Sequence, residues 1–142
     1  MTTIQRSALV RQPAERMFDL VNDVAGYPAR FRWCEAADVI EATDAHMVAR
    51  LALRLGGLRT AFTTRNTLQR PERIELALVE GPFRRLSGVW TFQSLGEGAC
   101  RVGLLLDFEL AGKLMGSALA MGFQGLADKL VDEFCREAQR DG

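Results

Sequence analysis

Hydrophobic residues alternate with other residues near the end of the chain. The alternating positions within 101–110 are Val102, Leu104, Leu106, Phe108 and Leu110. A period of two predicts a strand with one buried face. From Gly112 to about Gln139 the spacing becomes helical, with apolar residues at Met115, Leu119, Phe123, Leu126, Leu130 and Phe134. This helix is over twice the usual length of about 12 residues. In a small protein it can bury its apolar stripe only by lying across a whole sheet. We expect a hollow between the helix and the curved sheet.

Four earlier segments show the same period of two. They are 47–55, 59–69, 73–79 and 86–95, and two further segments, 3–11 and 34–42, also favour strands. The four are separated by glycine and proline, which favour turns, at Gly56-Gly57, Pro71 and Gly81-Pro82. Short turns between consecutive strands favour antiparallel pairing of neighbours.

Two short helices are expected between the first two strands. Pro13 suits the first turn of one helix, and the second helix covers about 26–31. The predicted fold class is therefore α+β. We expect one curved antiparallel sheet of about six to seven strands around the long C-terminal helix, in a single domain over 1–142.

Composition limits the class of protein. Apolar residues make up 48% of the chain, which is typical of a globular protein and excludes general disorder. The first ten residues lack a leader pattern, and no apolar run is long enough to span a bilayer. Cys34, Cys100 and Cys135 form no CxxC pair, so we expect reduced thiols. These features predict a cytoplasmic protein, in contact with the inner membrane only peripherally.

Charge is unevenly distributed, although the net charge is zero. Between His46 and Leu106 there are nine arginines and four acidic residues, a net charge of +5, and the rest of the chain carries −5. A basic segment attracts the phosphates of nucleic acids or lipid headgroups. The alternative is that arginine simply fills solvent-facing strand positions. The best candidates for a polar surface site are Arg65, Asn66, Arg84 and Arg85.

Catalytic chemistry has little support in the sequence. The single histidine, His46, is expected in a turn, and one histidine cannot form a multi-His metal site. Asp107 and Glu109 would suit acid–base chemistry, but they share a strand face with Arg101, opposite the apolar row. We therefore expect these carboxylates to face solvent and to pair with arginines. No catalytic or metal site is predicted.

Large apolar side chains favour a hydrophobic pocket under the long helix. Such side chains suit a flat ring with an isoprenoid tail, although plain core packing also explains them. The residues expected to line the pocket are Tyr27, Phe31, Trp33, Phe62, Trp90, Phe92, Leu106, Phe108, Met115, Leu119 and Phe123.

Several motifs, in chain order, carry a resemblance to a known family. They include Leu20-Val21-Asn22-Asp23-Val24, Phe62-Thr63-Thr64-Arg65-Asn66, Gly81-Pro82-Phe83-Arg84-Arg85-Leu86 and Gly88-Val89-Trp90-Thr91-Phe92. The chain resembles the START-like superfamily, also called helix-grip or polyketide cyclase/dehydrase-like, and within it the coenzyme-Q-binding and ribosome-association-toxin family. Where that family has Phe-Leu-Pro before Trp-Cys, this chain has Arg30, Phe31 and Arg32.

The resemblance implies two functions. One branch of the family binds ubiquinone and supports respiration, and the other consists of bacterial toxins that bind the large ribosomal subunit and block subunit association. Our leading hypothesis is a non-enzymatic carrier that holds ubiquinone, or a similar polyprenyl lipid, in the hollow between sheet and helix. The alternative is a ribosome-association toxin, and the second alternative is a polyketide cyclase/dehydratase-like enzyme.

Overall fold

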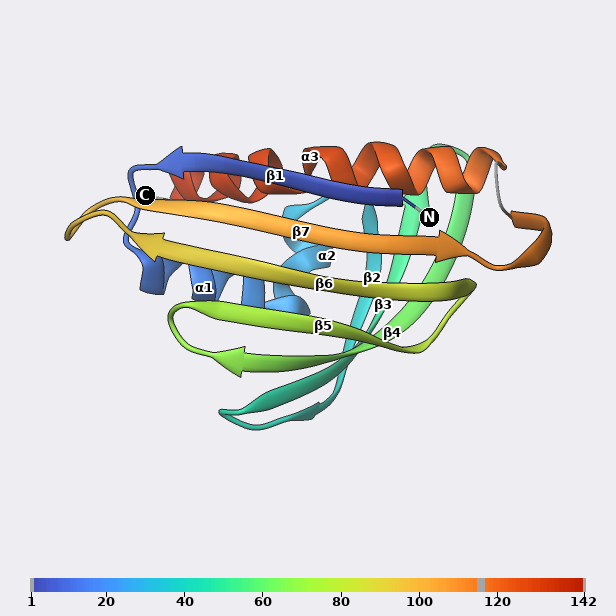
Figure 1. Cartoon of the computed structure of the whole chain (residues 1–142), viewed down its shortest axis with the longest axis horizontal. Helices are drawn as coiled ribbons and strands as arrows, with labels where there is room; N and C mark the ends of the chain where they lie inside the picture. The colour runs from blue at the N-terminus through green and yellow to red at the C-terminus, as the bar shows by residue number, and fades with distance from the viewer. Residues whose placement is uncertain (1, 115–116, 142) are drawn as a thin grey trace.

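A seven-stranded antiparallel sheet forms the centre of the fold, with the strand order β1-β7-β6-β5-β4-β3-β2 (Figure 1). The computed structural model describes residues 2–114 and 117–141. The strands are β1 (Thr2–Val10), β2 (Cys34–Ala42), β3 (His46–Leu55), β4 (Leu58–Gln69), β5 (Arg73–Glu80), β6 (Phe83–Ser94) and β7 (Cys100–Leu110). The predicted α+β class and the predicted strands are confirmed, and the largest shift is at β6, which begins at Phe83 rather than near residue 86.

Strand order follows the chain with one exception. From β2 to β7, each strand lies beside its sequence neighbours, because short turns return the chain antiparallel. β1 instead pairs with β7 at the far edge of the sheet, where Ile4 lies opposite Leu106. The first and last strands of the chain are therefore side by side (Figure 1).

The helices pack against one face of the curved sheet. They are α1 (Ala14–Asn22), η1 (Val24–Gly26), α2 (Tyr27–Arg30), η2 (Gly112–Leu114) and α3 (Ala118–Asp141). In Figure 1, α3 runs along β1 and β7, and α1 lies behind β6 and β5. The sheet thus curves around α3 as expected, and α1, α2 and α3 lie on the side that the inward-facing strand residues cover.

The alternation in β7 shows how the core forms. Val102, Leu104 and Leu106 are each at most 4% exposed, whereas Arg101, just before Val102, and Leu105, between Leu104 and Leu106, are exposed. Burial of each large apolar side chain contributes roughly 1.5–3 kcal/mol. A shift by one residue would bring the other face inward, so the pattern fixes the register of β7 against its neighbours.

The long helix begins later than the spacing predicts. Gly112 has a φ of 51°, in the left-handed region that interrupts a helix, and only a 3₁₀ turn follows it at Gly112–Leu114. Ser117 then provides a new start, because its Oγ accepts a hydrogen bond from the Ala120 N–H at 3.2 Å, as an N-cap does. The predicted helical residue Met115 lies outside the described residues.

The second short helix also differs in detail from the prediction. Instead of one helix over 26–31, a 3₁₀ turn at Val24–Gly26 leads directly into α2 at Tyr27–Arg30. Among the residues that the structure describes, no helix has the length and apolarity to cross a bilayer.

Candidate functional site

A cavity of about 100 Å³ lies between the inner face of the sheet and the helices. Side chains of α1, η1, α2 and α3 form one side of its wall, and inward-facing residues of β3 to β7 form the other. Six of the residues predicted to bind a ligand line it, namely Tyr27, Trp33, Phe62, Trp90, Leu106 and Phe123. The cavity therefore lies where the sequence places the hollow.

The other predicted lining residues belong to the packed core. Phe31, Phe92, Phe108 and Leu119 are buried or half-buried but lie outside the cavity wall. Phe92, for example, packs edge-on against Phe18 with ring centroids 5.7 Å apart. Met115 lies outside the described residues. Core packing accounts for the apolar side chains of Phe31, Phe92, Phe108 and Leu119.

Aromatic rings fill most of the expected hollow. Phe134 of α3 contacts both Tyr27 and Trp90, with ring centroids 5.3 Å apart in each pair. Phe123 packs against Phe108 at 4.8 Å. The remaining space, about 100 Å³, is smaller than the apolar cavity of about 150 Å³ that admits benzene. A quinone ring with its tail would fit only if this core opened.

One wall of the cavity is polar. Asn66 was expected on the surface, but it is 6% exposed and faces the cavity. The Thr64 hydroxyl donates a hydrogen bond to Asn66 Oδ1 at 2.8 Å. Asn66 is buried because side chains alternate between the two faces of a strand. It lies on the same face of β4 as Phe62 and Leu68, both of which point inward.

The described cavity wall has one ionisable side chain, Tyr27. Its hydroxyl donates a hydrogen bond to the Val21 carbonyl, and burial raises its pKa well above the ordinary value. Tyr27 therefore stays neutral and is held in place by the backbone. Among the described lining residues, the cavity offers hydrogen-bonding groups but no carboxylate, histidine or amine for proton transfer.

A separate surface groove of about 860 Å³ lies between α3 and the β3–β4 hairpin, and we call it the α3–hairpin groove. Its lining consists of Arg32, Trp33, Arg54, Leu55, Gly56, Gly122, Gly125, Leu126, Lys129, Asp132, Glu133 and Arg136. Trp33 and Leu126 line both the groove and the cavity, so these two side chains form the partition between them. Sequence analysis missed this groove, because its residues are far apart in the chain.

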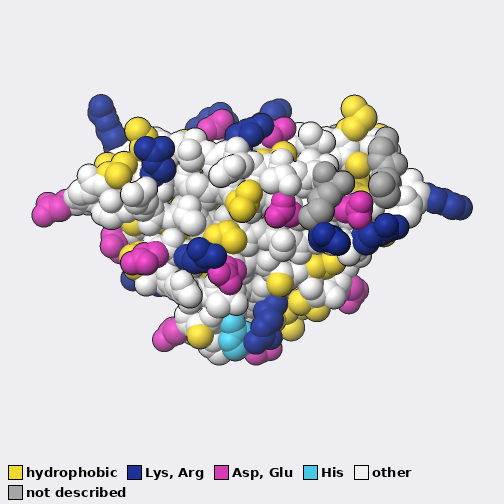
Figure 2. All heavy atoms as spheres, viewed as in Figure 1, with side chains coloured by type: hydrophobic (Ala, Val, Ile, Leu, Met, Phe, Trp, Pro, Cys, Tyr) yellow, Lys and Arg dark blue, Asp and Glu magenta, His cyan; other side chains and the backbone are white. Residues whose placement is uncertain are grey.

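The predicted surface arginines are exposed, but acidic residues lie among them. Arg65, Arg84 and Arg85 are all exposed, and Arg84 Nε lies 3.8 Å from Glu109 Oε2. Figure 2 shows Lys and Arg side chains interspersed with Asp and Glu over β1, β7, β6 and β5. This part of the outer face has the mixed charge of an ordinary solvated surface. Asp107, expected to pair with arginine, accepts a hydrogen bond from the Thr3 hydroxyl at 2.6 Å.

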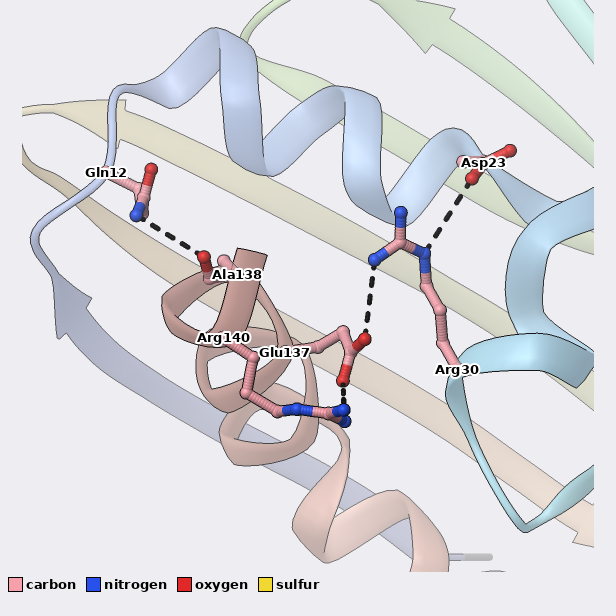
Figure 3. Close-up of polar contacts among 6 residues, drawn as sticks. All are labelled: Gln12, Asp23, Arg30, Glu137, Ala138 and Arg140. Carbon is pink, nitrogen blue, oxygen red and sulfur yellow. Dashed lines mark hydrogen bonds and ion pairs between the residues drawn. The ribbon is translucent and has the colours of Figure 1, made fainter. Parts of the chain in front are cut away.

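A charged network joins α2 to the C-terminal part of α3 (Figure 3). Glu137 is 8% exposed, and its Oε1 lies 3.4 Å from Arg30 Nη1. Its Oε2 accepts a hydrogen bond from Arg140 Nη1 at 3.0 Å, while Arg30 Nε lies 3.9 Å from Asp23. Arg30, one of the residues that depart from the family pattern, therefore ties the loop region before β2 to α3.

The remaining candidate chemistry is structural. His46 begins β3 and pairs with Glu41, with 2.8 Å between Nε2 and Oε1. The described residues contain no cluster of His, Cys, Asp and Glu that would hold a metal ion. Cys34, Cys100 and Cys135 are free thiols, and burial raises the pKa of Cys34 and of Cys135 to about 11.

Comparison with known families decides the classification. Residues 10–135 match the family described as "Polyketide cyclase / dehydrase and lipid transport". The chain belongs to this family. The START-like resemblance inferred from the sequence is thereby confirmed, and so is the helix-grip fold.

The chain is also similar in sequence to proteins named for ribosome association. The chain is 46% identical over 139 residues to "Ribosome association toxin RatA" of Pseudomonas aeruginosa, covering 98% of this chain and 96% of the relative. It is 40% identical over 139 residues to the protein of the same name in Escherichia coli K12, covering 98% and 88%. Among solved structures, the Zhui aromatase/cyclase from Streptomyces sp. R1128 superposes with a TM-score of 0.84 at 21% identity, covering 98% and 94%. That last likeness shows the fold.

Proposed function

We propose that this protein binds the large ribosomal subunit and thereby blocks its association with the small subunit. The observation that carries the proposal is 40–46% identity, over 98% of the chain, to proteins named ribosome association toxins. At this identity and coverage, the chain shares the fold of those relatives over nearly its whole length. The small cavity supports the same choice, because it leaves the outer surface as the main area for contacts.

Such a function needs binding and no chemistry. A bound 15.7 kDa protein placed where the two subunits meet would exclude the second subunit by its volume. Ribosomal RNA presents dense phosphate charge, so exposed arginine and lysine would strengthen the binding and make it salt-dependent. Exposed cations such as Arg32, Arg54 and Lys129 meet this requirement.

The test is subunit joining in a sucrose gradient. Purified protein is added to separated small and large subunits before the magnesium concentration is raised. We expect fewer joined ribosomes, with the protein sedimenting with the large subunit. In the control the protein is added after joining, and we expect a smaller effect because the contact area is already covered. An unchanged joined fraction, with the protein remaining at the top of the gradient, would refute the proposal.

Binding of a hydrophobic ligand is the second candidate function. It is supported by the apolar cavity, with the polar pair of Thr64 and Asn66 on one wall. A ubiquinone would have to displace the rings of Phe134 and Phe123, because the space is about 100 Å³. Organic extraction of the purified protein followed by mass spectrometry tests this candidate. Absence of a quinone, together with no saturable binding of added ubiquinone, would refute it.

Cyclase or dehydratase chemistry receives less support from the same cavity. General acid–base catalysis needs a group whose pKa lies near the working pH. Tyr27, the ionisable residue of the described wall, has a pKa that burial raises away from that range. The geometry therefore favours a binding protein over an enzyme.

A further inference from the structure

The α3–hairpin groove has a surplus of positive charge. Its charged lining residues are four cations and two acids, namely Arg32, Arg54, Lys129, Arg136, Asp132 and Glu133. One of the acids is already neutralised, since Arg136 Nη1 lies 2.8 Å from Glu133 Oε2. The cations come from the loop before β2, from β3 and from α3. Positive charge therefore borders the groove on more than one side.

Two arginines lie directly opposite each other beside the groove. Arg54 on β3 is the cross-strand partner of Arg59 on β4, and like charges in this position destabilise a sheet. Glu35 lies between them, with its carboxylate oxygens 3.6 Å from Arg54 and 3.4 Å from Arg59. One carboxylate neutralises one guanidinium, so a positive charge remains. Local features that cost stability are concentrated at functional sites.

Two further cations of the groove are available to a partner. Arg32 and Lys129 are both exposed. Over residues 2–114 and 117–141, neither has an ion pair within 4.0 Å. Arg32 lies on the loop between α2 and β2, and Lys129 lies on α3. They therefore flank the groove on two sides with charge that the protein itself leaves unneutralised.

The groove has open space beside α3 and an aromatic side chain in its wall. A methyl group added at Gly125 would meet no atom within 4 Å, so this stretch of α3 leaves space for a partner. Trp33 is half-buried in the groove wall. Cations combined with an aromatic side chain are the arrangement that binds single-stranded nucleic acid, through phosphate contacts and base stacking.

We propose that the α3–hairpin groove binds the sugar–phosphate backbone of ribosomal RNA, with Arg32, Arg54 and Lys129 contacting phosphates. This inference rests on the proposed function and assigns it to one surface. The outer face of β1, β7, β6 and β5 is a weaker candidate, because opposite charges are interspersed there (Figure 2). Arg84 and Arg85, which the sequence analysis favoured, lie on β6 within that face, so the proposal assigns the main contacts to the groove instead.

The test compares two double variants of the whole protein with the same change in charge. The groove variant is Arg32→Gln/Lys129→Gln. The matched control is Arg50→Gln/Arg101→Gln, which removes two exposed cations of the sheet from outside the groove. Each of these four residues is exposed and has no ion pair within the described residues, so both variants should fold with the thermal midpoint of the wild type. Binding to purified large subunits is measured by co-sedimentation from 50 to 200 mM KCl.

We expect the groove variant to bind more weakly and with a shallower dependence on salt. Loss of two phosphate contacts reduces the slope of log K against log salt by about 1.4–1.8. The ratio of wild-type to variant affinity should therefore fall by about 7- to 12-fold between 50 and 200 mM KCl. The control should follow the wild type within about twofold at every salt concentration.

The outcomes separate the groove from the function. If the wild type binds subunits and both double variants weaken equally, the groove assignment is refuted while ribosome binding stands. If the wild type fails to bind subunits, the proposed function itself is refuted. A third measurement uses protein-free RNA extracted from the large subunit. If the groove variant loses binding to subunits but binds this RNA as the wild type does, the groove contacts a ribosomal protein and the RNA assignment is overturned.

Discussion

Replacement of Phe134 by alanine tests whether the core is as full as the structure shows. Phe134 is 1% exposed and contacts the rings of Tyr27, Phe31 and Trp90, with centroids 4.8–5.3 Å apart. A buried Phe→Ala change costs about 3–5 kcal/mol, and the cost rises with the volume left empty. Phe134 already borders a cavity of about 100 Å³, so the two spaces merge and we expect the upper half of this range.

The assay is urea unfolding, followed by thermal unfolding with and without benzene. The merged space in Phe134→Ala should exceed the roughly 150 Å³ that admits benzene, so saturating benzene should raise its thermal midpoint through mass action. The wild type should not respond. Phe134→Leu is the matched control, in which leucine fills more of the space and both effects should be smaller.

Two results would refute this reasoning. A loss below about 1 kcal/mol in Phe134→Ala would mean that Phe134 is not packed as described. Stabilisation of the wild type by benzene would mean that the interior has more room than about 100 Å³. The second result would also restore the ligand carrier as the leading function.

Three further predictions follow from individual contacts. Arg30→Ala should destabilise the protein by about 1–3 kcal/mol, because buried Glu137 loses a charged partner; an unchanged urea midpoint would contradict this. Hydrogen bonds from Arg70 lower the pKa of Asp19 from 3.8, so this pair stabilises the fold above about pH 3.8 and the contribution is lost as pH falls. The difference in thermal midpoint between wild type and Asp19→Asn should therefore shrink as the pH falls below about 3.8, and a constant difference would argue against the pair. Burial raises the pKa of Cys34 to about 11, so its alkylation rate, followed by mass spectrometry, should rise about tenfold per pH unit from 8 to 10; a plateau near pH 9 would disagree.

Periodicity predicted strands such as β7 because one face of the strand is buried and the other is not. In β7, for instance, Val102 and Leu104 are buried while Arg101 is exposed, and a local pattern is enough to show it. The same rule applied to β4 would have placed Asn66 inside. The prediction of Asn66 at a surface site was wrong, because a buried amide is stable when it is hydrogen-bonded, as Asn66 is by Thr64.

Features that depend on distant parts of the chain could not be predicted. The size of the cavity depends on how Phe134 packs between Tyr27 and Trp90, and no local pattern specifies ring orientation. The α3–hairpin groove joins Arg32 to Lys129, which are far apart in sequence. The start of α3 depends on the cap at Ser117. The spacing of the apolar residues alone predicts a helix that begins earlier, at Gly112.

The pairing of β1 with β7 has a consequence for synthesis. β1 consists of residues 2–10, and its partners lie at residues 100–108. The first strand therefore waits until about three-quarters of the polypeptide has been made, and α3 is made after that. Contacts this distant in sequence form late in folding. The sheet edge at β1 and the helix that lies along it are therefore completed only when nearly the whole chain has been synthesised.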